Sequence, residues 1–247
     1  MSRVVVKFLG SGDLFGRGGS LQTGISVAAA GTHCLLDCGA SSLIGMRRWQ
    51  VNPLDIDAVL ITHLHGDHFG GLPYFLLDAH LISRRTKPLI LAGPPGLEAR
   101  TRQAMAVLFP GSEQMHPRFD LIFVELVERA TTPLGELSVT PYRVLHPSGA
   151  PAYALRVTLL GKTITYSGDT EWTDALIAAA AGTDLFICEA YFFEKRVKYH
   201  LDYQTLMAHK RELDCKQLVV THMSQDMLDR LDDLEVAYAT DGKTFQL

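Results

Sequence analysis

The stretch Thr62-His63-Leu64-His65-Gly66-Asp67-His68 places three imidazoles and one carboxylate within six residues. It directly follows Ala58-Val59-Leu60-Ile61, an apolar run typical of a buried strand. Imidazole and carboxylate groups are the ligands that zinc and its first-row neighbours take in proteins. The stretch therefore predicts a metal site at a strand end. The alternative is a polar loop that happens to contain histidines.

The spacing of these side chains also bears on the number of metal ions. In an extended segment, His63 and His65 project in the same direction. Asp67 and His68 can turn inward where the next helix begins. Two ligand pairs with different directions indicate two metal ions.

Length and composition indicate an ordinary globular protein. The chain has 247 residues, of which 47% are hydrophobic and 20% charged, and we expect one domain over residues 1–247. The net charge of −4 provides no general attraction to nucleic acid. The apolar runs are too short to cross a bilayer, and residues 1–7 lack the layout of a signal peptide, so we expect a cytoplasmic protein without membrane contact.

Other residues of metal-binding type follow predicted strands. They are Asp37 after Cys34–Leu36, His146 after Leu137–Val144, Asp169 after Lys162–Tyr166, and His222 after Leu218–Thr221. Taken alone, Asp37 could equally cap a turn, and His146 could be a histidine at a sheet edge. Together with the stretch Thr62–His68, these residues predict metal ligands that converge from the ends of several strands.

Two further segments matter for the interpretation of the site. Leu72, Phe75, Leu76 and Ala79 follow a helical stripe that Ile82 would extend, which predicts a helix packed on the sheet behind the opening stretch. The basic cluster Arg84-Arg85-Thr86-Lys87 either lies on a solvated face or attracts a phosphate-bearing substrate.

The order and spacing of these residues resemble the metallo-β-lactamase superfamily, and most of all its branch with ribonuclease Z and small phosphodiesterases. The resemblance implies an α/β fold: a four-layer αββα sandwich of two mixed β-sheets flanked by helices. It implies two divalent metal ions, zinc in first place, with manganese or iron as alternatives. One ion would be bound by His63, His65 and His146, the second by Asp67, His68 and His222, with Asp169 as a bridge and Asp37 steadying the ligand loops.

The resemblance also implies an enzyme, a metal-dependent phosphodiesterase that acts through a hydroxide shared by the two metal ions. Asp67, Asp169 and His200 are the expected catalytic residues, His200 as a general acid, although Leu201 replaces the small hydroxyl residue usual after that histidine. No residues are assigned to an organic cofactor.

The expected substrate is a small phosphodiester or one derived from nucleic acid. No Gly/Pro-rich basic arm is inserted between Gly96 and His146, which, with the acidic net charge, disfavours tRNA. Substrate choice is assigned to the loops around Gly16, Arg84 and His200. The oligomeric state stays open from the sequence, with a homodimer as one possibility because dimers are common among similar proteins.

Two other functions stay open from the sequence. The same pair of metal ions could hydrolyse a carboxylic ester, thioester or lactone. A protein from another class, a non-hydrolytic metal-binding or redox module, would hold two irons and is expected to need an attached electron-transfer domain. A β-lactamase is disfavoured by Asp169 at the bridging position.

Overall fold

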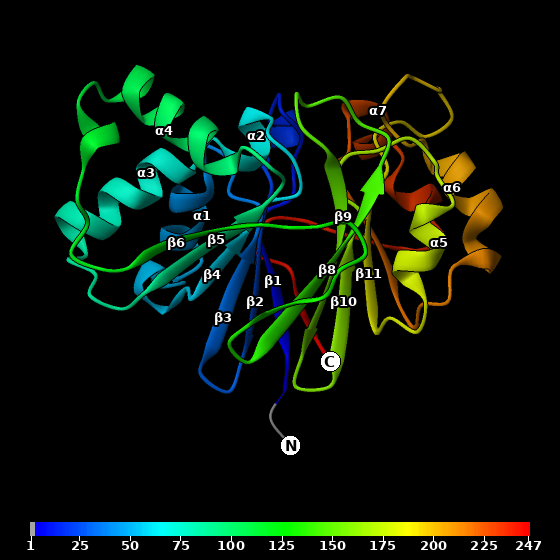
Figure 1. Cartoon of the computed structure of the whole chain (residues 1–247). Coiled ribbons are helices and arrows are strands. Elements are labelled where there is room, and N and C mark those ends of the chain that lie inside the picture. The colour runs from blue at the N-terminus through cyan, green and yellow to red at the C-terminus, as the bar shows by residue number, and fades with distance from the viewer. Residues whose placement is uncertain (1–2) are drawn as a thin grey trace.

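Two seven-stranded β-sheets pack face to face in the computed structural model, which describes residues 3–247 (Figure 1). The strand order is β14-β1-β2-β3-β4-β5-β6 in the first sheet and β13-β12-β11-β10-β9-β8-β7 in the second. Helices cover the outer face of each sheet, so the predicted four-layer αββα sandwich is confirmed.

The first sheet is mixed. Strands β3 to β6 run parallel to one another, whereas β1 pairs antiparallel with both β2 and β14, and β2 pairs antiparallel with β3. Its strands are β1 (Val5–Gly10), β2 (Gly24–Ala29), β3 (Thr32–Leu36), β4 (Ala58–Leu60), β5 (Leu89–Gly93), β6 (Leu121–Glu125) and β14 (Thr244–Gln246).

The second sheet is also mixed. Strands β7 to β10 form antiparallel pairs, whereas β10 to β13 run parallel. Its strands are β7 (Thr132–Leu134), β8 (Leu137–Val144), β9 (Ala152–Leu159), β10 (Lys162–Tyr166), β11 (Leu185–Glu189), β12 (Leu218–Thr221) and β13 (Ala237–Tyr238).

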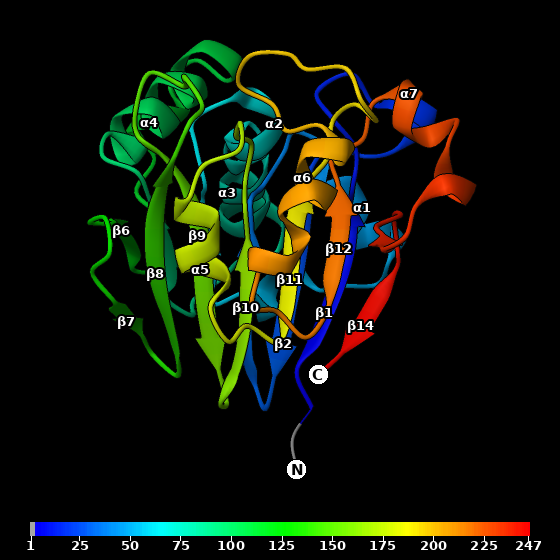
Figure 2. The same cartoon turned by 90° about the vertical axis from the view of Figure 1, so that its right-hand side faces the viewer.

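The helices are short and amphipathic. On the outer side of the first sheet lie α1 (Ser42–Arg48), α3 (Leu72–Leu77) and α4 (Leu97–Leu108), and on that of the second sheet lie α5 (Ala175–Ala180) and α6 (Tyr203–His209) (Figure 1). The short helices α2 (Gly66–Phe69) and α7 (Gln225–Leu228) lie at the top edge of the sandwich (Figure 2). Single helical turns complete the set: η1 (Arg17–Gly19), η2 (Pro53–Asp55), the π-turn η3 (Asp78–Ile82), η4 (Ser112–Gln114), η5 (Lys210–Glu212) and η6 (Leu231–Asp233).

The helix predicted from Leu72 changes geometry halfway. Leu72, Phe75, Leu76 and Ala79 are buried as the stripe requires, but Ile82 is 72% exposed. The α-helix passes into the π-turn at Asp78, which shifts the later residues out of register with the stripe.

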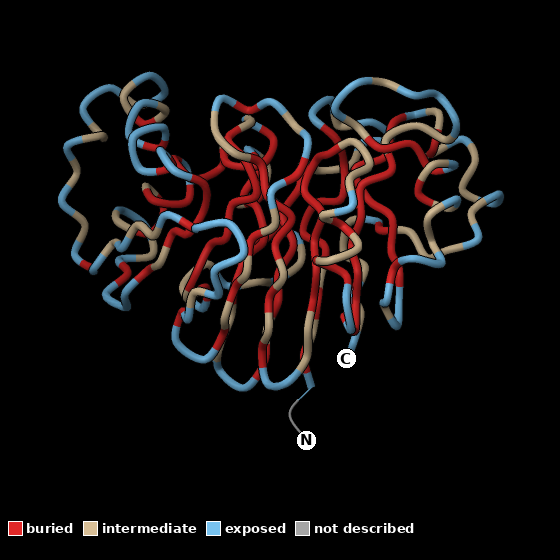
Figure 3. The backbone as a smooth tube through the Cα atoms, turned by 45° about the vertical axis from the view of Figure 1, so that its right-hand side comes forward, coloured by how far each residue is buried: buried red, intermediate tan, exposed pale blue. Residues whose placement is uncertain are grey.

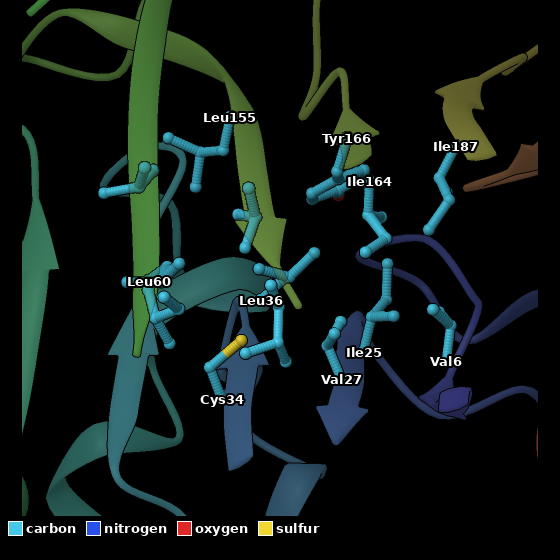
Figure 4. Packing of buried hydrophobic residues seen from close by; sticks show 14 of the residues in the cluster. Val6, Ile25, Val27, Cys34, Leu36, Leu60, Leu155, Ile164, Tyr166 and Ile187 are labelled. Carbon is cyan, nitrogen blue, oxygen red and sulfur yellow. The ribbon is translucent and has the colours of Figure 1, made fainter. Parts of the chain in front are cut away.

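The main core lies between the two sheets, where side chains from both inner faces meet (Figure 4). Its members include Val6, Ile25, Val27, Cys34, Leu36 and Leu60 from the first sheet, and Leu155, Ile164, Tyr166 and Ile187 from the second. A second apolar cluster lies between the first sheet and its helices, and a third lies between the second sheet and its helices. Figure 3 shows that the buried residues follow the strands, whereas most exposed residues lie in the loops at the strand ends and in the outer helices.

Because strands β3 to β6 are parallel and β10 to β12 are parallel, each group presents its carboxyl ends at one edge of its sheet. The side chains after those ends can therefore converge. No helix within residues 3–247 has the length and apolar character needed to cross a membrane.

Candidate metal centre

The stretch Thr62–His68 follows strand β4 and runs into helix α2, as predicted. His63 is buried, and His65 occupies the position before the first residue of α2. His63, His65 and His146 each offer a ring nitrogen, and these three atoms lie within 4.8 Å of one another. His146 Nε2 lies 3.0 Å from His65 Nδ1. The structure thus gathers the three histidines predicted as one set.

The second predicted set also converges. Asp67, His68, Asp169 and His222 each offer one atom to a group within 4.8 Å, and all four residues are buried. His68 Nε2 lies 3.3 Å from Asp67 Oδ2 and 3.3 Å from Asp169 Oδ1. His222 Nε2 lies 3.3 Å from Asp169 Oδ2.

Asp169 faces both groups. Its Oδ2 is 3.9 Å from His63 Nε2 and 4.0 Å from His146 Nε2, in addition to its contacts with His68 and His222. The carboxylate therefore stands between the two sets, at the position that the sequence assigns to a bridge.

Asp37 lies behind the ligands rather than among them. Fully buried, it accepts hydrogen bonds from the Thr62 backbone N–H at 2.8 Å and from the Thr62 hydroxyl. His68 Nδ1 is 2.6 Å from Asp37 Oδ2, which leaves His68 Nε2 facing the site without a proton once the imidazole is neutral. Asp37 occupies the left-handed backbone region, with φ 56°, so the end of β3 is locally strained.

Close backbone packing brings the ligand loops together. A Cβ atom at Gly39 would lie 2.3 Å from the Asp67 carbonyl oxygen, and one at Gly168 would lie 2.9 Å from Thr62 Cβ. Gly168 also has φ +58°. Only glycine fits both positions without moving the loops that carry Asp67 and Asp169.

The donor set fits metal ions. Among the described residues, His63 Nε2, His68 Nε2 and Asp169 Oδ1 are buried atoms that no protein group satisfies with a hydrogen bond, although the last two are only 3.3 Å apart. Buried polar atoms without partners are costly, and their convergence here gives them a common partner in a cation.

The charges in the cluster are strongly coupled. Burial and the neighbouring His68 hold the pKa of His63 well below its usual value. Burial also disfavours the charged form of His222, but the charge of Asp169 outweighs it and raises the pKa of His222 to about 9. The Asp169 pKa is held well below its usual range, because His222 and His68 outweigh the effect of its burial. Asp169 therefore stays ionised and available as a ligand.

His146 is fixed from its outer side. Its Nδ1 lies 2.8 Å from the Tyr199 carbonyl oxygen, so this nitrogen donates and Nε2 is left as the electron-pair donor toward the site. The same contact ties the end of β8 to the loop that carries His200.

His200 lines the cavity beside the two groups. Its Nδ1 is 3.0 Å from Oε2 of Glu189, and Glu189 Oε1 accepts the Thr170 backbone N–H. Burial disfavours the imidazolium, but hydrogen bonding and charge from Glu189 outweigh it and raise the pKa of His200. Burial raises the pKa of Glu189 to about 7. Glu189 and His200 as a pair therefore keep at least one proton at neutral pH.

A cavity of about 280 Å³ opens over these residues. Its floor is polar and its walls are partly apolar, lined by Leu14, Phe15, His65, Gly66, Asp67, His146, Asp169, Tyr191, His200 and His222. The loop before Gly16 and the loop of His200 thus both border the site, as the sequence predicts. The lining by Leu14, Phe15 and Tyr191 is not predicted from the sequence. The aromatic run Tyr191-Phe192-Phe193 between a strand end and His200 was the available signal.

The assignment of the Arg84–Lys87 cluster to substrate binding is wrong. These residues precede β5, whereas the candidate metal ligands His63 to His68 follow the parallel strand β4, so they lie at opposite edges of the sheet. Arg85 is 1% exposed and donates to the carbonyls of Ile56, Lys87 and Pro88, each at 2.7 Å. Lys87 forms an ion pair with Asp57. The cluster stabilises the far edge of the sheet.

Comparisons with known proteins place the chain in context. The family model described as "Anti-Pycsar protein Apyc1" matches residues 4–245. Ribonuclease Z of Lachnoclostridium phytofermentans is 25% identical over 276 aligned positions, which cover 90% of this chain and 88% of that protein. Because the alignment is longer than the whole chain, the relative has inserted residues that this chain lacks.

Two solved structures show the same architecture. The short form of human tRNase Z has a TM-score of 0.79 at 24% identity and covers 98% of both chains. The metallo-beta-lactamase fold protein YhfI from Bacillus subtilis has a TM-score of 0.78 at 19% identity and covers 100% of both. These likenesses confirm the fold that the sequence predicts.

Proposed function

Since this chain belongs to the Anti-Pycsar protein Apyc1 family, and its ribonuclease Z relatives confirm the predicted metal-dependent hydrolase branch, we propose that it hydrolyses a small phosphodiester. The observation that carries the proposal is the convergence of the seven predicted ligands in two adjoining groups, five members of which line one cavity together with His200.

Seven side chains would hold two metal ions. His63, His65 and His146 form one set, Asp67, His68 and His222 form the other, and the Asp169 carboxylate is shared between them. This mixture of nitrogen and oxygen donors suits zinc first, and manganese or iron second. A pair of divalent ions supplies an acidified water molecule and positive charge for a developing oxyanion.

His200 would act as the general acid. The ring reaches the cavity, and its Nδ1 is engaged by Glu189, so Nε2 is left as the nitrogen that carries a proton to the departing alkoxide. Proton donation by a positioned side chain contributes roughly 10²- to 10⁴-fold to a reaction rate. Glu189 stabilises the charged imidazolium and keeps its orientation.

The cavity favours a small substrate over tRNA. Its volume of about 280 Å³ holds one compact phosphodiester with part of an organic ester group. Residues 97–144 form α4, η4 and strands β6 to β8, so this stretch is built into the sandwich and supplies no basic arm.

Turnover by metal-loaded protein tests the proposal. The panel contains bis(p-nitrophenyl) phosphate and cyclic nucleotides on one side, and lactones and thioesters on the other. We expect turnover of phosphodiesters that is lost in His65→Ala and Asp67→Ala and kept in His116→Ala, because His116 is an exposed histidine outside the cluster. Turnover of lactones or thioesters alone would favour the carboxylic ester alternative, and two irons with reversible redox chemistry would favour the redox alternative.

A further inference from the structure

Asp13 is a fully buried carboxylate that the proposed reaction does not use. Its Oδ1 accepts the backbone N–H of Phe15 at 3.1 Å and that of Arg17 at 3.2 Å. Its Oδ2 accepts the Tyr191 hydroxyl at 3.4 Å. One carboxylate therefore joins the loop before η1 to the segment that follows β11, 178 positions further along the chain.

Tyr191 connects this carboxylate to the site. Its ring stacks on His200, with centroids 4.8 Å apart and planes at 30°, and it also lies 6.1 Å from the ring of His222. The Tyr191 backbone is held on both sides, since its N–H donates to Leu201 and its carbonyl accepts from Ser224. The hydroxyl bond to Asp13 then fixes the remaining rotation of the side chain.

The loop that Asp13 holds presents apolar side chains to the cavity. Leu14 is 51% exposed and Phe15 is 65% exposed, and both line the cavity whose polar part is formed by the metal-binding residues. Single exposed apolar residues are common on protein surfaces. These two differ because a buried carboxylate fixes their backbone and because they face a cavity lined by Tyr191 and His200.

Resting on the proposed function, we propose that Leu14 and Phe15 form a wall that binds the flat, apolar ester group of the phosphodiester, and that Asp13 is the residue that positions this wall against Tyr191. A charged acceptor holds backbone N–H groups more strongly than a neutral one. Removing Asp13 would free two backbone N–H donors and the Tyr191 hydroxyl together, so the wall and the ring beside His200 would lose their relative placement.

The test measures binding rather than turnover, so that its failure is separate from failure of the proposed function. Phenylphosphonate and methylphosphonate share an anionic head for the metal ions and differ in the ring. Calorimetry on zinc-loaded protein gives the ratio of their affinities. The variants are Phe15→Ala, Asp13→Ala, Asp13→Asn and Tyr191→Phe, with Leu160→Ala as a control, because Leu160 is 45% exposed in the turn between β9 and β10.

We expect phenylphosphonate to bind wild type about tenfold more tightly than methylphosphonate, as partial burial of one ring provides. Phe15→Ala and Asp13→Ala should reduce this preference to less than threefold, and Tyr191→Phe should reduce it in part. Asp13→Asn should restore it, because the amide oxygen can accept both N–H groups while the amide nitrogen donates to the Tyr191 hydroxyl. Leu160→Ala should bind as wild type does.

Two results would overturn the inference. Equal affinity of wild type for the two phosphonates would show that Leu14 and Phe15 do not bind the ring. An unchanged preference in Asp13→Ala would remove the positioning role of Asp13. Where Asp13→Ala fails to fold, an unchanged preference in Tyr191→Phe would do the same.

Discussion

His200 Nδ1 lies 3.0 Å from Oε2 of Glu189, a carboxylate that solvent does not reach. Glu189 also accepts the backbone N–H of Thr170, next to Asp169. One side chain therefore joins the residue proposed as general acid to the loop of the proposed bridging ligand.

Replacing Glu189 by Gln should lower kcat about 10- to 100-fold with little change in KM, because Glu189 supports His200 and does not line the cavity. The direction in which the pH dependence of kcat shifts follows from the negative charge of Glu189. Glu189 raises the pKa of His200 against the effect of burial, so its loss lowers that pKa. A general acid is needed protonated, so the alkaline limb of the kcat profile should move to lower pH.

A second Glu–His pair provides the control for this variant. His209 Nδ1 lies 2.7 Å from Glu212 Oε1, outside the cavity, so Glu212→Gln should leave kcat and the pH profile as in wild type. The double variant of Glu189→Gln with His200→Ala should be no slower than His200→Ala alone. Additive losses, or a change confined to KM, would contradict the coupling.

Zinc affinity should rise with pH between about 6.5 and 9. A metal ion needs the lone pair of a neutral imidazole, whereas Asp169 raises the pKa of His222 to about 9 despite burial, so His222 carries a proton at neutral pH before metal binds. Each proton that leaves makes the apparent affinity rise about tenfold per pH unit. Calorimetry in buffers of different ionisation enthalpy counts the released protons. The count should fall by one in His222→Ala, and pH-independent affinity would contradict the assignment.

Asp37→Asn should weaken metal binding about 10- to 100-fold at the set of Asp67, His68 and His222, although Asp37 touches none of the space between the ligands. An asparagine can place its amide donor against His68 Nδ1, which would move the imidazole proton to Nε2 and remove the lone pair that faces the site. Elemental analysis after dialysis should find close to one ion per chain in place of two.

Asp57→Asn is the matched control for Asp37→Asn. Asp57 also accepts a backbone N–H, that of His33, but it lies at the opposite edge of the first sheet. It should keep the metal content of wild type. Loss of both ions in each variant would indicate unfolding rather than a local effect.

The strand ends explain how much of this site the sequence could predict. An apolar run followed by His63, Asp169 or His222 carries its own signal, because parallel strands place their carboxyl ends at one edge. Asp13 and Tyr191 meet across 178 positions, and nothing periodic in either segment indicates the other. Side-chain direction after a strand ends depends on loop geometry, which the sequence pattern does not specify. The fold could therefore be predicted in full outline, and the cavity walls could not.

Arg85 is a second case in which the sequence pattern does not specify the structure, because a basic cluster does not reveal that one of its members is buried. Three carbonyls, of Ile56, Lys87 and Pro88, each receive a hydrogen bond of 2.7 Å from its guanidinium. Arg85→Ala would remove three hydrogen bonds from a charged donor, one of them to the buried Ile56 carbonyl, and should lower the free energy of unfolding by about 3 to 5 kcal/mol. Arg85→Lys should recover little of it, because an ammonium cannot reach three separated carbonyls with planar geometry.

Urea unfolding measures the loss, and the neighbouring Arg84→Ala is the control, because Arg84 is exposed. Turnover per folded molecule should stay that of wild type in all three variants, since this cluster lies at the edge of the sheet opposite to the candidate metal ligands. A selective rise of KM in Arg85→Ala with unchanged stability would instead return the cluster to substrate binding, and would contradict the structural role that its buried hydrogen bonds assign to it.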